Sequence, residues 1–232
     1  MKLGILIALI AFGFTNSGLG QKVLSADTDG NHFRWSLRKA QELDYRQTIR
    51  RSNELTSGEQ ALLLRAVAAQ IRPFKAELEI GSERELQQFA ANTRIKLIDL
   101  DDDGVAEILA QAKDFEAGCG ATGNCPFWVF QRTRAGFKLL FDSRGGQAVG
   151  GFQTFTIEPN RTNGFNDLVF GTSEESDGIT LVVYRYRNGQ YRESACYNAN
   201  RLSTKGGEFH ILKDPVITPC VARVLAKQSQ SQ

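Results

Sequence analysis

The chain has 232 residues, of which 41% are hydrophobic and 23% are charged, and its formal net charge at neutral pH is +2. This composition is ordinary for a soluble globular protein and provides enough apolar side chains to form a core. The nearly balanced charge gives no electrostatic reason to expect a nucleic acid as a partner.

The first 20 residues have the pattern of an export signal. Lys2 precedes an almost purely apolar run over residues 3–14, and Gly18 and Gly20 place small residues where a signal peptidase would cleave before Gln21. The run is shorter than the roughly 20 residues that a membrane-spanning helix needs. We therefore expect residues 1–20 to be a signal peptide, the protein to be secreted or periplasmic, and no transmembrane segment to remain after cleavage.

Residues 21–52 form a polar leader followed by a basic segment. The part from 34 to 51 has no glycine or proline and includes several large apolar side chains, which favours a helix. This segment fits either a binding patch for an anionic cell-surface polymer or lipid headgroups, or the solvated face of a helix. Its basic side chains are Arg34, Arg38, Lys39, Arg46, Arg50 and Arg51.

Two further helices are marked by capping boxes, in which a serine or threonine is followed three residues later by a glutamate. The first box begins at Thr56 and the second at Ser82. Pro73 would end the first helix, because proline lacks the amide donor that a helix interior requires. The second helix is shorter and carries Leu86, Phe89 and Ala90 on one face.

From residue 94 onward the pattern changes to short apolar runs separated by turn signals, which is typical of strands. Asn188–Gly189 is a strong hairpin signal, because both central residues of the tight turn need positive φ. We predict an α+β fold, with N-terminal helices over residues 34–92 followed by a mostly antiparallel β-sheet over 94–225. The single domain would cover residues 53–226, and residues 227–232 would be a disordered tail.

Residues 99–107 carry the clearest chemical signal in the chain. Carboxylates alternate along the segment, a glycine follows, and a further carboxylate comes four residues after Asp103. Closely spaced carboxylates repel one another, and a hard cation such as calcium, which binds six to eight oxygens, would relieve that repulsion. An acidic surface turn without metal is the alternative, and magnesium or manganese could use the same oxygens. The predicted calcium ligands are Asp99, Asp101, Asp103, Glu107 and the carbonyl of Val105.

This segment resembles the calcium loops of FG-GAP and related integrin-α-like propeller repeats, in which a D-x-D-x-D-G-x-x-D/E run joins two strands. The resemblance covers about 15 residues and implies a local metal loop, not a whole-chain family. A weaker echo of residues 103–109 occurs at residues 163–169, sixty positions later. Pro159 and Arg161 stand where the first two acids would be, so the echo is either a degenerate repeat or a common Asn-Gly turn.

The four cysteines agree with export, because an even number in an exported chain indicates disulfides. Three pairings are possible. We predict Cys119–Cys125 and Cys196–Cys220, because the members of each pair are close in sequence. Zinc is the alternative, but the spacing of the first pair is not the usual one and no histidine is near.

No catalytic motif stands out, and His32 and His210 have no companion residues. We expect a non-catalytic, calcium-binding module that binds or supports a protein or another component of the bacterial envelope or extracellular space. One alternative is an inhibitor of an extracellular hydrolase such as lysozyme, acting through the Cys119–Cys125 loop or the Thr204-Lys205-Gly206 run, which is similar to the inserted loop of periplasmic lysozyme inhibitors. Another is a secreted hydrolase whose site has no recognised motif.

Overall fold

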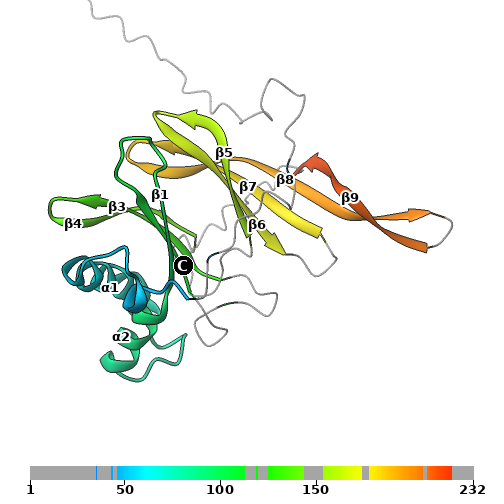
Figure 1. Cartoon of the computed structure of the whole chain (residues 1–232). Coiled ribbons are helices and arrows are strands. Elements are labelled where there is room, and N and C mark those ends of the chain that lie inside the picture. Colours follow the sequence, from blue (N-terminus) through cyan, green and yellow to red (C-terminus); the bar gives the residue numbers. More distant parts are fainter. Residues whose placement is uncertain are drawn as a thin grey trace, which may run out of the picture.

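The computed structural model describes residues 35, 43, 46–112, 119, 125–143, 154–173, 178–205 and 208–220 (Figure 1). In these residues nine strands form two antiparallel sheets, and within each sheet every strand pairs with the next strand in the chain. The smaller sheet contains β1 (Arg94–Ile98), β2 (Glu107–Gln111), β3 (Phe127–Thr133) and β4 (Gly136–Asp142). The larger sheet contains β5 (Thr154–Thr162), β6 (Phe165–Ser173), β7 (Gly178–Arg187), β8 (Gln190–Lys205) and β9 (Glu208–Pro219).

The predicted α+β class is wrong, because the fold is β-rich. Its helical part consists of two short α-helices, α1 (Ser57–Ile71) and α2 (Glu83–Asn92), with the one-turn 3₁₀ helices η2 (Ile49–Arg51) and η3 (Arg72–Phe74). The strands are also longer than the apolar runs that predict them. β8 continues through polar Asn200, for example, because the backbone there pairs with Gly178 of β7 on one side and Val216 of β9 on the other.

The predicted helix over residues 34–51 is wrong for the residues that the structure describes. Residues 46–48 are not helical, and η2 follows as a single turn. Thr48 forms a β-bridge with Arg94, the Ile49 amide donates to the Thr93 carbonyl (3.0 Å), and the Ile95 amide donates to the carbonyl of residue 47 (2.8 Å). The edge of β1 therefore holds the backbone in an extended form, which the local pattern could not indicate. Residues 36–42 lie outside the described part.

Both predicted capping boxes are confirmed. The Glu59 amide donates to the Thr56 hydroxyl (3.2 Å), while the Glu59 carboxylate accepts from the Thr56 amide (2.8 Å). Ser82 and Glu85 make the same reciprocal pair at the start of α2. These bonds satisfy backbone donors that have no partner within a helix, so they fix where each helix begins.

The described elements pack in three layers, with the smaller sheet in the middle. Residues of β2 alternate between its two faces: Ile108 and Ala110 pack against the helices, and Leu109 packs against the larger sheet. The alternation follows from the two-residue period of a strand. All five residues of β2 are buried, because both faces of the strand are covered. Aromatic rings fill the interface between the sheets, where Phe127 and Phe170 have ring centroids 4.9 Å apart.

Two Asn-Gly turns connect strands of the larger sheet. Asn188 and Gly189 have φ values of 52° and 82°, and the β7–β8 hairpin turns there as predicted. Asn163 and Gly164, with φ values of 50° and 90°, form the turn between β5 and β6. Both pairs fit the two-residue turn with positive φ at each central position.

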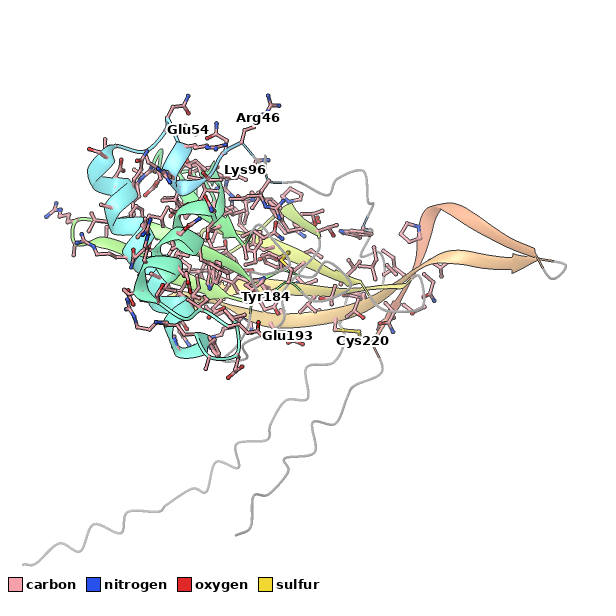
Figure 2. The ribbon with its side chains drawn as sticks, turned by 90° about the horizontal axis from the view of Figure 1, so that it is seen from below. Arg46, Glu54, Lys96, Tyr184, Glu193 and Cys220 are labelled. Atoms are coloured by element: carbon pink, nitrogen blue, oxygen red, sulfur yellow. A yellow bond between two sulfur atoms is a disulfide. The ribbon has the colours of Figure 1, made fainter. Side chains whose placement is uncertain are left out.

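The structure contains the disulfides Cys119–Cys125 and Cys196–Cys220, as predicted. The second links β8 to the residue after β9, and Cys220 lies where the β8–β9 ribbon leaves the body of the molecule (Figure 2). Two disulfides indicate an oxidising environment, outside the cytosol. None of the helices in the described residues is long and apolar enough to cross a membrane. The predicted signal peptide and disordered tail lie outside the described part.

Candidate metal centre

The acidic segment forms the connection between β1 and β2. Ile98 and Glu107 are the last register pair of this hairpin, so Asp99 directly follows β1 and Glu107 is the first residue of β2. Two positive φ angles, 58° at Asp102 and 85° at Gly104, turn the chain back on itself. The predicted strand–loop–strand setting is therefore correct for this segment.

Three of the predicted metal ligands come together. Asp99, Asp101 and Glu107 each offer a carboxylate oxygen, and these oxygens all lie within 4.8 Å of one another. Asp99 and Asp101 are partly buried, and Glu107 is only 1% exposed. Oδ1 of Asp99 is buried and accepts no hydrogen bond among the described residues. A buried oxygen without a donor is costly, and a cation at this point would satisfy it. The residues present therefore fit a metal ion.

The remaining carboxylates of the loop have other partners. Asp103 Oδ1 accepts from the Val105 amide at 2.7 Å, and Asp103 is not among the three converging residues. Asp102 is exposed and forms an ion pair with Arg161 of β5. Val105, whose carbonyl is a predicted ligand, is also exposed. Asp99 Oδ2 accepts from the Gly104 amide at 2.9 Å, which closes the loop.

Among the converging carboxylates, Glu107 has the pKa that burial raises most clearly. Removal from water raises the pKa of Glu107 to about 7; the hydrogen bond from the Leu100 amide opposes this shift, and the nearby negative charge of Asp101 adds to it. Burial also raises the pKa of Asp101, and the charges of Asp103 and Asp99 add to that rise. Asp101 and Glu107 therefore resist being ionised together, and a bound cation would relieve that repulsion.

Asp167, a second buried carboxylate, is neutralised by an ion pair with an arginine. Asp167 is 4% exposed and occupies the position of Glu107 in the sequence echo. Its charge is balanced by Arg185 (3.2 Å), and its other oxygen accepts from the Thr162 hydroxyl (2.7 Å). Among the described residues no cationic side chain makes such a pair with Glu107. The fold thus places an arginine beside one buried acid and leaves a cluster of carboxylates around the other.

The loop is docked on the larger sheet through its buried Leu100. The Leu100 side chain lies in the core between the sheets, and its carbonyl accepts from the Asn166 amide (2.8 Å). The Tyr191 hydroxyl donates to the carbonyl of Asn166 (3.0 Å), and burial, together with the charge of Glu107, raises the pKa of Tyr191. The candidate site therefore lies at the junction of the two sheets.

Arg132 of β3 links the other side of the loop to α1. Its guanidinium donates to the Ala106 carbonyl (2.9 Å) and pairs with Glu59 of the α1 capping box (3.0 Å). Through these two contacts Arg132 connects α1 to the loop and fixes Ala106, the residue immediately before Glu107. Sequence reasoning missed Arg132, Asn166 and Tyr191, because they come from distant strands. Of these three residues, only Asn166 lies in a segment that the sequence analysis singled out, the echo at residues 163–169.

The two loops that the sequence suggested for hydrolase inhibition, Cys119–Cys125 and Thr204-Lys205-Gly206, are only partly described by the structure. Cys119 and Cys125 are buried, while residues 120–124 between them lie outside the described part. Thr204 and Lys205 end β8, and Gly206 is outside the described residues. The echo at Asn163–Gly164 is a tight two-residue turn and not a second acidic loop.

Comparisons of the chain with protein-family models, with curated proteins and with solved structures found no match. The geometry of the candidate site is therefore the basis for the functional conclusions.

Proposed function

We propose that the protein is an exported, non-catalytic module whose β1–β2 loop holds one structural calcium ion. The observation that carries the proposal is the convergence of Asp99, Asp101 and the buried Glu107, with one buried oxygen of Asp99 left without a donor. A site of this kind would stabilise the fold and leave other surfaces free for a protein or envelope component.

Calcium suits the donor set better than a softer metal does. All the donors are oxygens, and no cysteine or histidine is among the converging residues. Calcium–oxygen distances of about 2.3–2.6 Å place opposite ligands about 5 Å apart at most, which matches three oxygens within 4.8 Å of one another. Waters, Asp103 or the Val105 carbonyl could complete the six to eight ligands that calcium takes. The resemblance of residues 99–107 to FG-GAP loops favours the same metal.

The position of the loop supports a structural role. Leu100 packs between the sheets while its amide binds Glu107 and its carbonyl binds the larger sheet. A cation held by Glu107 would therefore hold the hairpin and the sheet junction together, coupling metal binding to folding. The two disulfides agree with a secreted or periplasmic location, where calcium is more abundant than in the cytosol.

A thermal melt of the oxidised protein with calcium and then with excess chelator tests the proposal. A ligand at 100 times its dissociation constant stabilises by about 2.7 kcal/mol. For a chain of this size that corresponds to a rise in Tm of roughly 5–10 °C. Asp101→Ala is expected to abolish the rise, because it removes one of the three converging oxygens.

Asp102→Asn is the matched control, because it removes a carboxylate charge from the same loop without touching the converging group, and asparagine tolerates the positive φ of this position. It should keep the calcium-dependent rise. An equal Tm with calcium and with chelator in the unsubstituted protein would leave residues 99–107 as an acidic turn without metal.

A further inference from the structure

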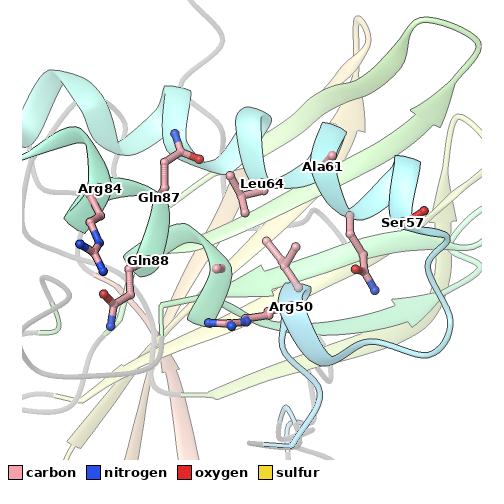
Figure 3. A pocket seen from close by; sticks show the side chains of 10 residues that line it. Arg50, Ser57, Ala61, Leu64, Arg84, Gln87 and Gln88 are labelled. Atoms are coloured by element: carbon pink, nitrogen blue, oxygen red, sulfur yellow. The ribbon is translucent and has the colours of Figure 1, made fainter.

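A groove of about 580 Å³ lies between η2, α1 and α2 (Figure 3). Its volume is in the range of about 300–1,000 Å³ that is usual for small-ligand sites. Apolar side chains of Ile49, Ala61, Leu64 and Ala91 form part of the lining. The polar lining residues are Arg50, Ser57, Gln60, Arg84, Gln87 and Gln88.

The two arginines of the groove have no carboxylate partner among the described residues. Arg84 lies between two acidic residues of α2 that are already engaged. Glu83 pairs with Arg72, and Glu85 accepts from the backbone amides of Gly81 and Ser82. Arg50 of η2 belongs to the basic segment of the sequence. In Figure 3 its guanidinium extends toward α2, on the side of the groove where Arg84 and Gln88 lie. Within the part of the chain that the structure describes, the groove therefore presents two positive charges without an ion-pair partner.

The amide side chains add oriented hydrogen-bonding groups. The Gln60 amide nitrogen donates to the Ser52 carbonyl (2.7 Å), which fixes that side chain in the groove lining. The Gln87 nitrogen is likewise held by Glu83 (3.1 Å). Two fixed amides, together with the Gln88 amide and the Ser57 hydroxyl of the same lining, suit a ligand with many hydroxyl groups. The apolar side chains of Leu64 and Ala61 suit the C–H face of a sugar ring.

We propose that this groove binds an acidic oligosaccharide, with the guanidiniums of Arg50 and Arg84 pairing with its carboxylates. Guanidinium and carboxylate groups match in shape and make strong charge-assisted hydrogen bonds. A lipid headgroup in a bilayer fits less well, because the cations line a concave, partly apolar groove and not a convex face. The proposal is independent of the metal site, since none of the groove residues belongs to the β1–β2 loop.

Titration of the full chain with tri-galacturonate, in the presence of chelator, tests the proposal. The double variant Arg50→Ala/Arg84→Ala is expected to raise Kd at least about tenfold, because charged hydrogen bonds are the stronger class. Arg65→Ala/Arg134→Ala makes the same change of net charge at exposed positions outside the groove and should leave Kd unchanged. Neutral maltotriose should bind much more weakly than the acidic trisaccharide.

Several outcomes would overturn the assignment. These are no binding of tri-galacturonate at millimolar concentration, equal Kd values for the groove variant and the unsubstituted chain, or equal weakening by the control pair. Preferential binding of a glutamate-rich peptide or of phosphatidylglycerol vesicles would reject a saccharide in favour of that ligand. The saccharide titration is done in chelator, so a failure to bind saccharide would not count against the calcium site. In the same way, a failure to bind calcium would not count against the saccharide proposal.

Discussion

Replacing Glu107 by glutamine is expected to stabilise the calcium-free protein above pH 7 and to remove its stabilisation by calcium. Glutamine keeps an oxygen that can accept from the Leu100 amide, as Oε2 of Glu107 does (2.9 Å). It lacks the buried negative charge, which repels Asp101 and is unfavourable away from water. Removing that charge should therefore help the fold when no cation is present and should weaken the site when calcium is added.

The effect depends on pH in a defined direction. The pKa of Glu107 is about 7 in the fold and near the ordinary value of 4.5 in the unfolded chain. Between these values the folded protein holds a proton that the unfolded chain has released, so stability falls as pH rises from 4.5 to 7. A shift of this size corresponds to about 3 kcal/mol at most. Calcium competes with that proton, so its stabilising effect should be larger at pH 8 than at pH 5.5.

Urea unfolding at pH 5.5 and pH 8, with calcium and with chelator, measures this prediction. With chelator at pH 8, Glu107→Gln should be more stable than the unsubstituted protein, and the order should reverse with calcium. Asp102→Asn is the control, because it removes a charge from the same loop at a side chain that is 68% exposed. Such a change should alter stability by no more than about 0.5 kcal/mol. The same pH dependence in Glu107→Gln and in the unsubstituted protein would contradict the account.

Leu100→Ala is expected to lower the free energy of unfolding by about 3 kcal/mol, with or without calcium. The side chain is fully buried between the sheets, so its removal leaves a cavity that the packed aromatic rings cannot fill. The variant should also weaken calcium binding, because the Leu100 backbone holds both Glu107 and the larger sheet. Urea unfolding gives the first quantity and a calcium titration gives the second.

Val105→Ala is the matched control for Leu100→Ala. Val105 belongs to the same loop but is 46% exposed, so its truncation should cost less than about 0.5 kcal/mol. Similar losses of stability in the two variants would show that the loop is not anchored in the core through Leu100.

Features encoded in short stretches of sequence were predictable. Thr56 with Glu59, and Ser82 with Glu85, are three residues apart, so each capping box is visible in the sequence. The converging carboxylates also come from nine consecutive residues, and their alternation around a glycine marks the segment, although the predicted set also includes Asp103 and Val105, which are not in the converging group. In both cases the interacting groups are close along the chain, so local spacing determines whether they meet.

Features that depend on distant segments were not predictable. The edge of β1 overrides the helical tendency of residues 46–51, and β8 continues through polar residues because strands flank it on both sides. The fold class was wrong for the same reason. Arg161 and Asn166 contact the acidic loop from the larger sheet, more than fifty residues away in sequence. Nothing in the spacing of residues 99–107 indicates those partners.

Calorimetric titration of the chelator-treated, oxidised protein with calcium at pH 8 shows whether the β1–β2 loop binds a metal ion. We predict a single saturable site whose binding is lost in Asp101→Ala and in Glu107→Gln and retained in Asp102→Asn. Absence of saturable calcium binding at millimolar concentration, or undiminished binding by Glu107→Gln, would contradict the assignment of Asp99, Asp101 and Glu107 as the ligands of a structural calcium ion.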